Sequence, residues 1–139
     1  MNDCIFCQII AKEIPSTPVY EDADVYAFLD ITPVHPGHTL VVPKVHGATL
    51  LDVSADVLAK MIQAVQRVAH AMKRGLAIDG FNVTQNNGTV AGQSVDHMHM
   101  HIIPRYPNDG LPAWPHKTYA SFQEADAWAQ KIRAQLQEA

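Results

Sequence analysis

The sequence lacks any apolar run that approaches the roughly 18 residues needed by a membrane-spanning helix. Its first residues also lack the charged and apolar segments of a secretory signal peptide. A basic surplus is missing too: the formal net charge is −4, whereas broad nucleic-acid binding usually comes with a basic patch. These absences predict a cytoplasmic protein whose partners are neither membranes nor nucleic acids.

Cysteine is scarce, and internal repeats and low-complexity segments are missing. The chain has two cysteines, and two thiols that are available for a metal suit a reducing compartment. Its 139 residues, of which 47% are hydrophobic, are enough for a sizeable single core. We therefore expect one domain over residues 1–139.

Apolar residues at the spacing of one helical face follow Ser54, a residue type that caps helix N-termini. Gly75 is of the type that caps the other end of such a helix. Apolar stretches between turn residues predict strands at residues 25–29, 39–42, 81–85 and 95–103. With a second helix near residues 121–137, the predicted fold class is α+β: an antiparallel sheet packed by one long helix, plus a C-terminal helix.

Three histidines, His97, His99 and His101, stand at every second position and alternate with large apolar residues. Side chains in a strand point alternately to opposite faces, so an extended chain places the three imidazoles on one surface and Met98 in the core. A helix would scatter the rings. Histidine titrates near neutral pH, which suits it to nucleophilic, acid–base and metal roles.

The length of this row limits what it can do alone. At about 3.3 Å per residue, the backbones of His97 and His101 lie roughly 13 Å apart, so one ion is poorly placed to bind all three rings. Division of labour is the better interpretation, with one ring as nucleophile or base and its neighbours in other roles. The alternative is a histidine-rich tract on a solvated strand face.

Two glycine-containing segments precede the row, Asn86-Asn87-Gly88 and Gly92-Gln93-Ser94. Glycine lets a backbone turn and approach a ligand closely, and the exposed N–H groups of such loops can form an anion-binding concavity. Gln93 and Ser94 add side-chain donors. A glycine-rich turn usually only connects strands, but one placed directly before a histidine row is typical of a phosphate cradle that faces a nucleophile.

The pattern His-x-His-x-His followed by two apolar residues resembles the signature of the histidine triad (HIT) family. Segments similar to the family occur in the expected order at residues 4–10, 12–15, 27–31 and 37–44. The resemblance covers about residues 4–105 and leaves residues 106–139 as a C-terminal extension. Gly92-Gln93-Ser94-Val95 and the loop with Asn86 look most like the Hint-type purine-nucleotide hydrolases, which implies a HIT-like fold.

The resemblance implies nucleotidyl transfer at the α-phosphate of a nucleoside phosphoramidate, an acyl-nucleotide or a dinucleoside polyphosphate. His99 would attack phosphorus and form a nucleotidyl-histidine that water then hydrolyses, a covalent route that replaces one hard displacement by two easier ones. His101 would reach the same phosphate, Ser94 and Asn86 would hydrogen-bond its oxygens or the leaving group, and His38 would support the triad. A dinucleoside polyphosphate hydrolase and a nucleotide-binding regulator with incidental hydrolysis are the alternatives.

The same resemblance assigns nucleoside-binding residues. Asp30 matches the position that receives the ribose hydroxyls, although it also suits a solvated turn before Thr32-Pro33. A carboxylate can accept hydrogen bonds from both hydroxyls. Side chains that would line the base pocket, each also a plausible core residue, are Ile5, Phe6, Ile9, Phe28 and Ile31.

Cys4 and Cys7 form a Cys-x-x-Cys, which is typical of a zinc knuckle or a redox pair and also arises by coincidence. The pair resembles that of bacterial family members in which two cysteines and two histidines form a zinc site. The resemblance implies that the matching histidines here are His46 and His97. A site closed by four protein ligands is structural. The alternative is a pair of reduced thiols without metal.

The extension after Tyr106 is rich in proline and aromatic residues, including Trp114, followed by His116. Such stretches usually run as irregular surface segments, here a linker to the last helix. Alternatively, Trp114 and His116 close over the substrate or lie at a dimer interface. A homodimer is implied by the family resemblance.

Overall fold

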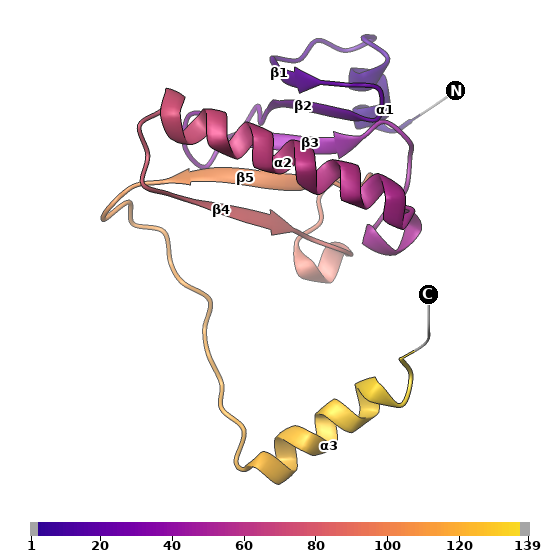
Figure 1. Cartoon of the computed structure of the whole chain (residues 1–139), viewed down its shortest axis with the longest axis vertical. Coiled ribbons are helices and arrows are strands. Elements are labelled where there is room, and N and C mark those ends of the chain that lie inside the picture. The colour runs from indigo at the N-terminus through magenta and orange to yellow at the C-terminus, as the bar shows by residue number, and fades with distance from the viewer. Residues whose placement is uncertain (1–2, 137–139) are drawn as a thin grey trace. The chain divides into compact units, whose positions relative to one another are not determined.

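Five strands form one antiparallel sheet in the order β1-β2-β3-β5-β4 in the computed structural model, which describes residues 3–136 (Figure 1). The strands are β1 (Pro18–Glu21), β2 (Val25–Leu29), β3 (Thr39–Pro43), β4 (Gly80–Gln85) and β5 (Met100–Arg105). The predictions for β2, β3 and β4 are confirmed to within one residue. β1, two short 3-10 turns and the short helix α1 (Ile5–Ile10) had not been expected.

The central strands β2 and β3 are buried on both faces of the sheet. Val25, Ala27 and Val41 pack in one core cluster with the long helix α2 (Ala55–Gly75), which crosses the sheet in Figure 1. The alternate residues of the same strands point the other way and pack against α1. That second cluster contains Phe6, Ile9, Tyr26, Phe28, Leu40 and Val42. The α1 face is the one that builds the candidate site.

Helix α2 begins as predicted, because the Ser54 side chain accepts a hydrogen bond from the Val57 N–H. Its C-terminal end corrects the sequence prediction: Gly75 is the last helical residue and Leu76 is the cap. The left-handed turn that a capping glycine usually makes is made two residues later by Ala77, with φ of 52°. No helix within residues 3–136 is long and apolar enough to cross a membrane.

The strand predicted over residues 95–103 instead begins at Met100, so His97 and His99 lie in an irregular bend before β5. The register pairs Val41 with Met100, which would place Pro43 opposite the second residue before Met100, Met98. Proline has no N–H to continue the ladder, and the Met98 N–H binds the Gly47 carbonyl at 2.7 Å instead. The predicted alternation nevertheless holds, since Met98 and Ile102 are fully buried.

Residues from Gly110 onward form a separate compact unit from residues up to Asp109. This second unit contains helix α3 (Phe122–Arg133), whose N-cap Ser121 accepts a hydrogen bond from the Glu124 N–H. The helix expected over residues 121–137 thus begins as predicted and ends at Arg133; residue 137 lies outside the described residues. That residues 1–139 form one domain stays a prediction.

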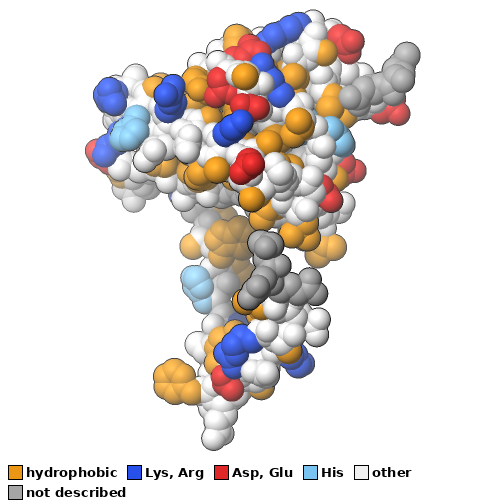
Figure 2. All heavy atoms as spheres, turned by 45° about the vertical axis from the view of Figure 1, so that its right-hand side comes forward, with side chains coloured by type: hydrophobic (Ala, Val, Ile, Leu, Met, Phe, Trp, Pro, Cys, Tyr) orange, Lys and Arg blue, Asp and Glu red, His pale blue; other side chains and the backbone are white. Residues whose placement is uncertain are grey.

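Charged side chains of both signs are intermixed on the molecular face shown in Figure 2. Lysine and arginine there lie beside aspartate and glutamate rather than in a patch of one sign. Ion pairs of this kind include Glu21 with both Lys12 and Lys44, at 3.1 and 2.8 Å. On this face the surface follows the mixed charge of the sequence.

Candidate active site

A cavity of about 700 Å³ opens on the α1 face of the sheet. That volume is in the range of small-molecule sites, which span roughly 300–1,000 Å³. Its walls come from α1, the connection to β1, strand β2 with the turn after it, and the histidine row. The predicted site residues that line it are Ile5, Phe6, Ile9, Phe28, Asp30, Ile31, Ser94, His99 and His101.

His99 is held in one tautomer by the backbone. Its Nδ1 lies 2.7 Å from the His97 carbonyl oxygen, and a carbonyl can only accept, so Nδ1 carries the proton. The lone pair is therefore on Nε2. Burial of the ring, which is 4% exposed, lowers the pKa of His99 and favours the neutral imidazole. Neutral imidazole with an unprotonated Nε2 is the nucleophilic form.

His101 has the opposite tautomer, set by a hydrogen-bond chain through His38. The Val34 N–H donates to His38 Nδ1 at 3.0 Å, so the neutral His38 carries its proton on Nε2. That Nε2–H donates to His101 Nδ1 at 2.9 Å and leaves the His101 proton on Nε2. Burial, followed by the neighbouring His99 and His38, lowers the pKa of His101 to about 4. His101 is thus a neutral hydrogen-bond donor at pH 7.

Asp30, His38 and His101 lie close enough together to suggest a cation site. A cation bound by His38 Nε2 would have to displace its proton to Nδ1, but Nδ1 is occupied by the Val34 N–H. This arrangement favours a proton-bearing chain over a metal site. Asp30 uses one carboxylate oxygen for the Thr32 turn at 2.9 Å, while the other lies 3.6 Å from His38 Nε2. Asp30 can therefore stabilise the turn before Thr32 and also line the cavity.

Gln93 fixes the loop before the histidine row. Its side chain accepts from the Gly88 N–H at 2.7 Å and donates to the carbonyls of Ala48 and Val95 at 2.6 and 2.8 Å. The residue is buried, and these partners all belong to the protein backbone. A direct role for Gln93 in substrate binding stays a prediction, and the structure places it beneath the loop.

Asn86 lies beside this loop rather than among the cavity-lining residues. Gly92 adopts a φ of +95°, and a Cβ at that position would meet the Asn86 side-chain nitrogen at 3.4 Å. Glycine therefore lets the loop approach Asn86 closely. Of the two predicted phosphate ligands in this region, Ser94 lines the cavity and Asn86 is not among the lining residues.

The apolar part of the cavity is built around Phe6. Its ring meets His99 edge-on at 5.1 Å between centroids and Phe28 at 5.5 Å. Phe6, Ile9 and Phe28 are buried, whereas Ile5 is 45% and Ile31 is 95% exposed. The two exposed isoleucines also line the cavity, and their predicted role in base binding stays a prediction.

Sequence reasoning missed one wall of the cavity, formed by residues 14–17 after α1. Lys12 takes a left-handed φ of 65° and reverses the chain there, a conformation that the lysine itself gives no reason to expect. The segment at residues 12–15 resembles the family, but the resemblance gives it no role. Its Pro15 is the sequence signal that could have indicated a turn of the chain toward the cavity.

A second cluster lies beside the cavity and joins Cys4, Cys7, His46 and His97. His46 Nδ1 and His97 Nδ1 are 3.2 Å apart, Cys4 Sγ lies 3.3 Å from His97 Nδ1, and Cys7 Sγ lies 3.4 Å from His46 Nδ1. Tetrahedral zinc with its usual bond lengths needs ligand separations of about 3.3 Å between nitrogens and about 3.6 Å between nitrogen and sulfur. The four residues can therefore hold a metal ion.

The tautomer of His97 agrees with this role. His97 Nε2 donates to the Pro43 carbonyl at 2.8 Å, so its Nδ1 lone pair faces the two sulfurs. A hydrogen bond that fixes the other ring nitrogen is the usual support of a metal-binding histidine. The thiols are not joined by a disulfide, and the Cys7 N–H donates to Cys4 Sγ at 3.4 Å. This donor set fits Zn²⁺.

Comparisons with known proteins agree on one family. The family model described as HIT domain matches residues 11–108. The adenosine 5'-monophosphoramidase HNT1 of Saccharomyces cerevisiae is 48% identical over 114 residues, which cover 81% of this chain and 70% of that protein.

Two crystal structures extend the comparison to the fold. A HIT family protein from Bacillus subtilis superposes with a TM-score of 0.90 at 40% identity, covering 99% of this chain and all of its own. A Zn-bound histidine triad family protein from Mycobacterium smegmatis gives a TM-score of 0.76 at 36% identity, covering 96% of this chain and 98% of its own. The α+β, HIT-like fold is confirmed, and the chain belongs to the histidine triad family.

Proposed function

We propose that this protein is a nucleotide phosphoramidase that hydrolyses purine nucleoside 5'-phosphoramidates and related nucleotides through a covalent intermediate on His99. The observation that carries the proposal is the fixed tautomer of His99, whose Nδ1–H is bound to the His97 carbonyl in the wall of a nucleotide-sized cavity. The name of the yeast relative, an adenosine 5'-monophosphoramidase, supports the same substrate class.

The first step is attack of the His99 Nε2 lone pair on the α-phosphorus. A phosphorus–nitrogen bond forms to His99 as the bond to the leaving amine breaks. The amine takes a proton from solvent at the open cavity, and the attack of water in the second step returns one proton to solvent. Positive charge develops on the His99 ring and is stabilised by the hydrogen bond to the His97 carbonyl, 2.7 Å away. Water then attacks phosphorus, releases the nucleoside monophosphate and restores neutral His99.

The surrounding side chains orient the nucleotide. His101 donates its Nε2–H to a phosphate oxygen, because its own Nδ1 is already occupied by His38. Ser94 supplies a hydroxyl at the cavity wall, and Asp30 accepts from the ribose hydroxyls. The base enters the apolar part of the cavity around Phe6 and Phe28. Such preorganised donors commonly supply the larger electrostatic part of catalysis.

Cys4, Cys7, His46 and His97 would hold Zn²⁺ as a structural ion. All four positions of a tetrahedral site are then filled by protein, so the metal contributes stability rather than chemistry on the substrate. Its effect on the active site is indirect. His97 carries the carbonyl that fixes the His99 tautomer, so anchoring His97 also anchors the nucleophile.

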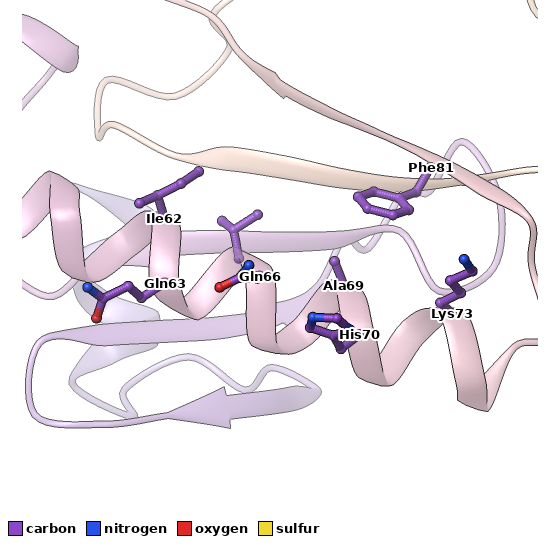
Figure 3. Close-up of a pocket in the computed structure, with 8 residues that line it drawn as sticks. Ile62, Gln63, Gln66, Ala69, His70, Lys73 and Phe81 are labelled. Atoms are coloured by element: carbon purple, nitrogen blue, oxygen red, sulfur yellow. The ribbon is translucent and has the colours of Figure 1, made fainter.

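A homodimer is part of the proposal, and strand β4 offers the surface for it. β4 is an edge strand of the sheet, and an unpaired strand edge is a template for pairing with another chain. Phe81 of β4 and Ile62 of α2 are 39% and 52% exposed. They border a hollow of about 630 Å³, in which Phe81 lies opposite Gln66 and Ala69 of α2 (Figure 3). A second copy would cover this apolar surface.

The decisive experiment is the intact-protein mass after rapid, acid-free quenching with adenosine 5'-phosphoramidate. We expect a transient adduct of one adenosine monophosphate in the wild type and none in His99→Ala. Arg74→Ala is the control, since Arg74 is exposed at the end of α2 and lines neither cavity. Hydrolysis by His99→Ala at the wild-type rate would remove the nucleophile assignment and favour a nucleotide-binding protein. Faster turnover of diadenosine polyphosphates than of the phosphoramidate would favour the dinucleotide hydrolase.

A further inference from the structure

The cavity has a polar pair that the proposed mechanism does not use. Ser16 lines the cavity, and its Oγ lies 2.7 Å from the hydroxyl of Tyr26. Tyr26 is 1% exposed and belongs to the otherwise apolar cluster beneath α1. A buried tyrosine hydroxyl needs a hydrogen-bond partner, and Ser16 supplies one at the edge of the open space.

The pair lies across the sheet from the catalytic groups. His99 and His101 lie on the β5 side, and β3 separates β5 from β2, the strand of Tyr26. The register pairs Tyr26 with Val42, and the pairing of Leu40 with His101 would set Val42 opposite His99, so Tyr26 is level with His99 rather than displaced along the strand. Ser16 lies one strand further, because the next residue, Thr17, accepts from the Leu29 N–H at 2.9 Å on the β1 side of β2. A nucleotide with its phosphate at His99 that extends over Leu40 and Phe28 therefore directs its base toward Ser16.

The two hydroxyls can serve a ligand as donor or acceptor. A serine hydroxyl has one proton and two lone pairs. Either hydroxyl can donate in this hydrogen bond. We assign Tyr26 as the donor to Ser16 Oγ, because the phenol is the stronger acid. Ser16 keeps its own O–H and a second lone pair for the cavity. It can donate to the 6-oxo group of guanine or accept from the 6-amino group of adenine.

We propose that Ser16, held in place by Tyr26, is a specificity-determining residue that hydrogen-bonds the 6-substituent of a purine base. It accepts adenine and guanine alike and discriminates against a purine that lacks a 6-substituent. The assignment rests on the proposed function for the direction in which the nucleotide lies. It concerns base recognition, so its effect belongs in KM rather than in kcat.

The test compares the 5'-phosphoramidates of adenosine and of purine riboside, which differ only at the 6-position. For the wild type we expect kcat/KM to favour adenosine about 3- to 10-fold, the range of one net neutral hydrogen bond. Ser16→Ala should abolish this preference while kcat for the purine riboside substrate stays within about twofold. Guanosine phosphoramidate should lose as much as adenosine. Thr17→Val removes the neighbouring hydroxyl on the same wall and should keep the preference.

Tyr26→Phe removes only the partner hydroxyl and should reduce the preference partially, with a thermal melt to verify folding. A readout without turnover uses His99→Ala, with calorimetric binding of adenosine monophosphate and purine riboside monophosphate with and without Ser16→Ala. If Ser16→Ala keeps the preference, or Thr17→Val loses it, the assignment is wrong. Absence of turnover together with a Ser16-dependent binding preference would overturn the proposed enzyme and leave the base contact standing.

Discussion

His97 and His99 are two residues apart on one segment, yet the structure gives them opposite protonation patterns. His97 donates from Nε2 to the Pro43 carbonyl and presents the Nδ1 lone pair to two thiols. His99 donates from Nδ1 to the His97 carbonyl and keeps its Nε2 lone pair. The lone pair of His97 is therefore available to a metal, and that of His99 is available for the attack on phosphorus in the proposed mechanism. The role of each histidine follows from which carbonyl its ring meets.

The two ends of the row also differ in how they are supported. On the metal side, the partners come from α1 and from the loop after β3, which bring Cys4, Cys7 and His46 to His97. On the catalytic side, the chain from Val34 through His38 orients His101. The first arrangement joins segments that are far apart in the sequence. The second determines which ring nitrogen of His38 and of His101 carries the proton. Damage to the metal side should thus affect stability first, and damage to the catalytic side should affect rate.

The largest rate effect is expected at the centre of the row. Replacing His99 with Ala removes the proposed nucleophile and should lower kcat for adenosine phosphoramidate by at least about a thousandfold, as loss of a nucleophile does in other enzymes. The fold should persist, because the core beneath is formed by Met98 and Ile102. Initial rates and a thermal melt measure the two effects. A loss of tenfold or less would reassign the nucleophile.

The metal side should show the reverse pattern. In the double variant Cys4→Ser and Cys7→Ser, we expect loss of bound zinc, a fall in the melting temperature of roughly 10 °C or more, and a much smaller change in kcat. Metal analysis of the wild type should give about one zinc per chain. Chelation of the wild type should reproduce the loss of stability. A large loss of kcat in a variant that remains folded would contradict a purely structural role.

An intermediate effect is expected for the hydrogen-bond chain. His38→Ala removes the donor to His101 Nδ1 and should lower kcat/KM by about 10- to 100-fold, the range of supporting contacts. His38→Gln offers an N–H in a similar place and should recover part of the loss. Steady-state kinetics of both variants give the comparison. Equal losses in the two would show that His38 acts by packing alone.

Much of this site is predictable from sequence because it depends on periodicity. The alternation of histidine with Met98 and Ile102 indicates which side chains are buried, and the apolar run of β2 indicates a central strand. The family segments also identify Phe6 and Phe28 as neighbours of the cavity. These features repeat every second residue, so they survive small errors in the predicted strand ends.

The parts that could not be predicted depend on single contacts between distant residues. The strand start at Met100 depends on the missing N–H of Pro43, more than fifty positions away. Ser16 reaches the cavity because Lys12 adopts a left-handed conformation. The buried amide of Gln93 finds the carbonyl of Ala48 only in the folded chain. Neither the composition nor the spacing of residues indicates which distant residues will make such contacts.

The smallest predicted effect is on the pH dependence of stability. Burial lowers the pKa values of His38 and His99, and lowers that of His101 to about 4. Unfolding exposes these rings, which then take up protons near pH 6.5. Between pH 6.5 and about 4 the unfolded chain binds more protons than the folded one, so stability falls as the pH decreases through this window. Above pH 6.5 both states are neutral at these rings and their contribution is constant.

Melting temperatures measured from pH 8 to pH 4.5 test this pH dependence. The variant His101→Gln isolates the contribution of one ring. The variant lacks one buried imidazole, so its melting temperature should decrease less steeply below pH 6.5 than that of the wild type. His116→Gln, at an exposed position of the unit that begins at Gly110, serves as the control for the loss of a histidine as such. Parallel curves for the wild type and His101→Gln would mean that His101 takes up its proton at the same pH in the folded and the unfolded protein. His101 would then titrate close enough to neutral pH to act as an acid toward the leaving amine, rather than serve only as a neutral donor to the phosphate.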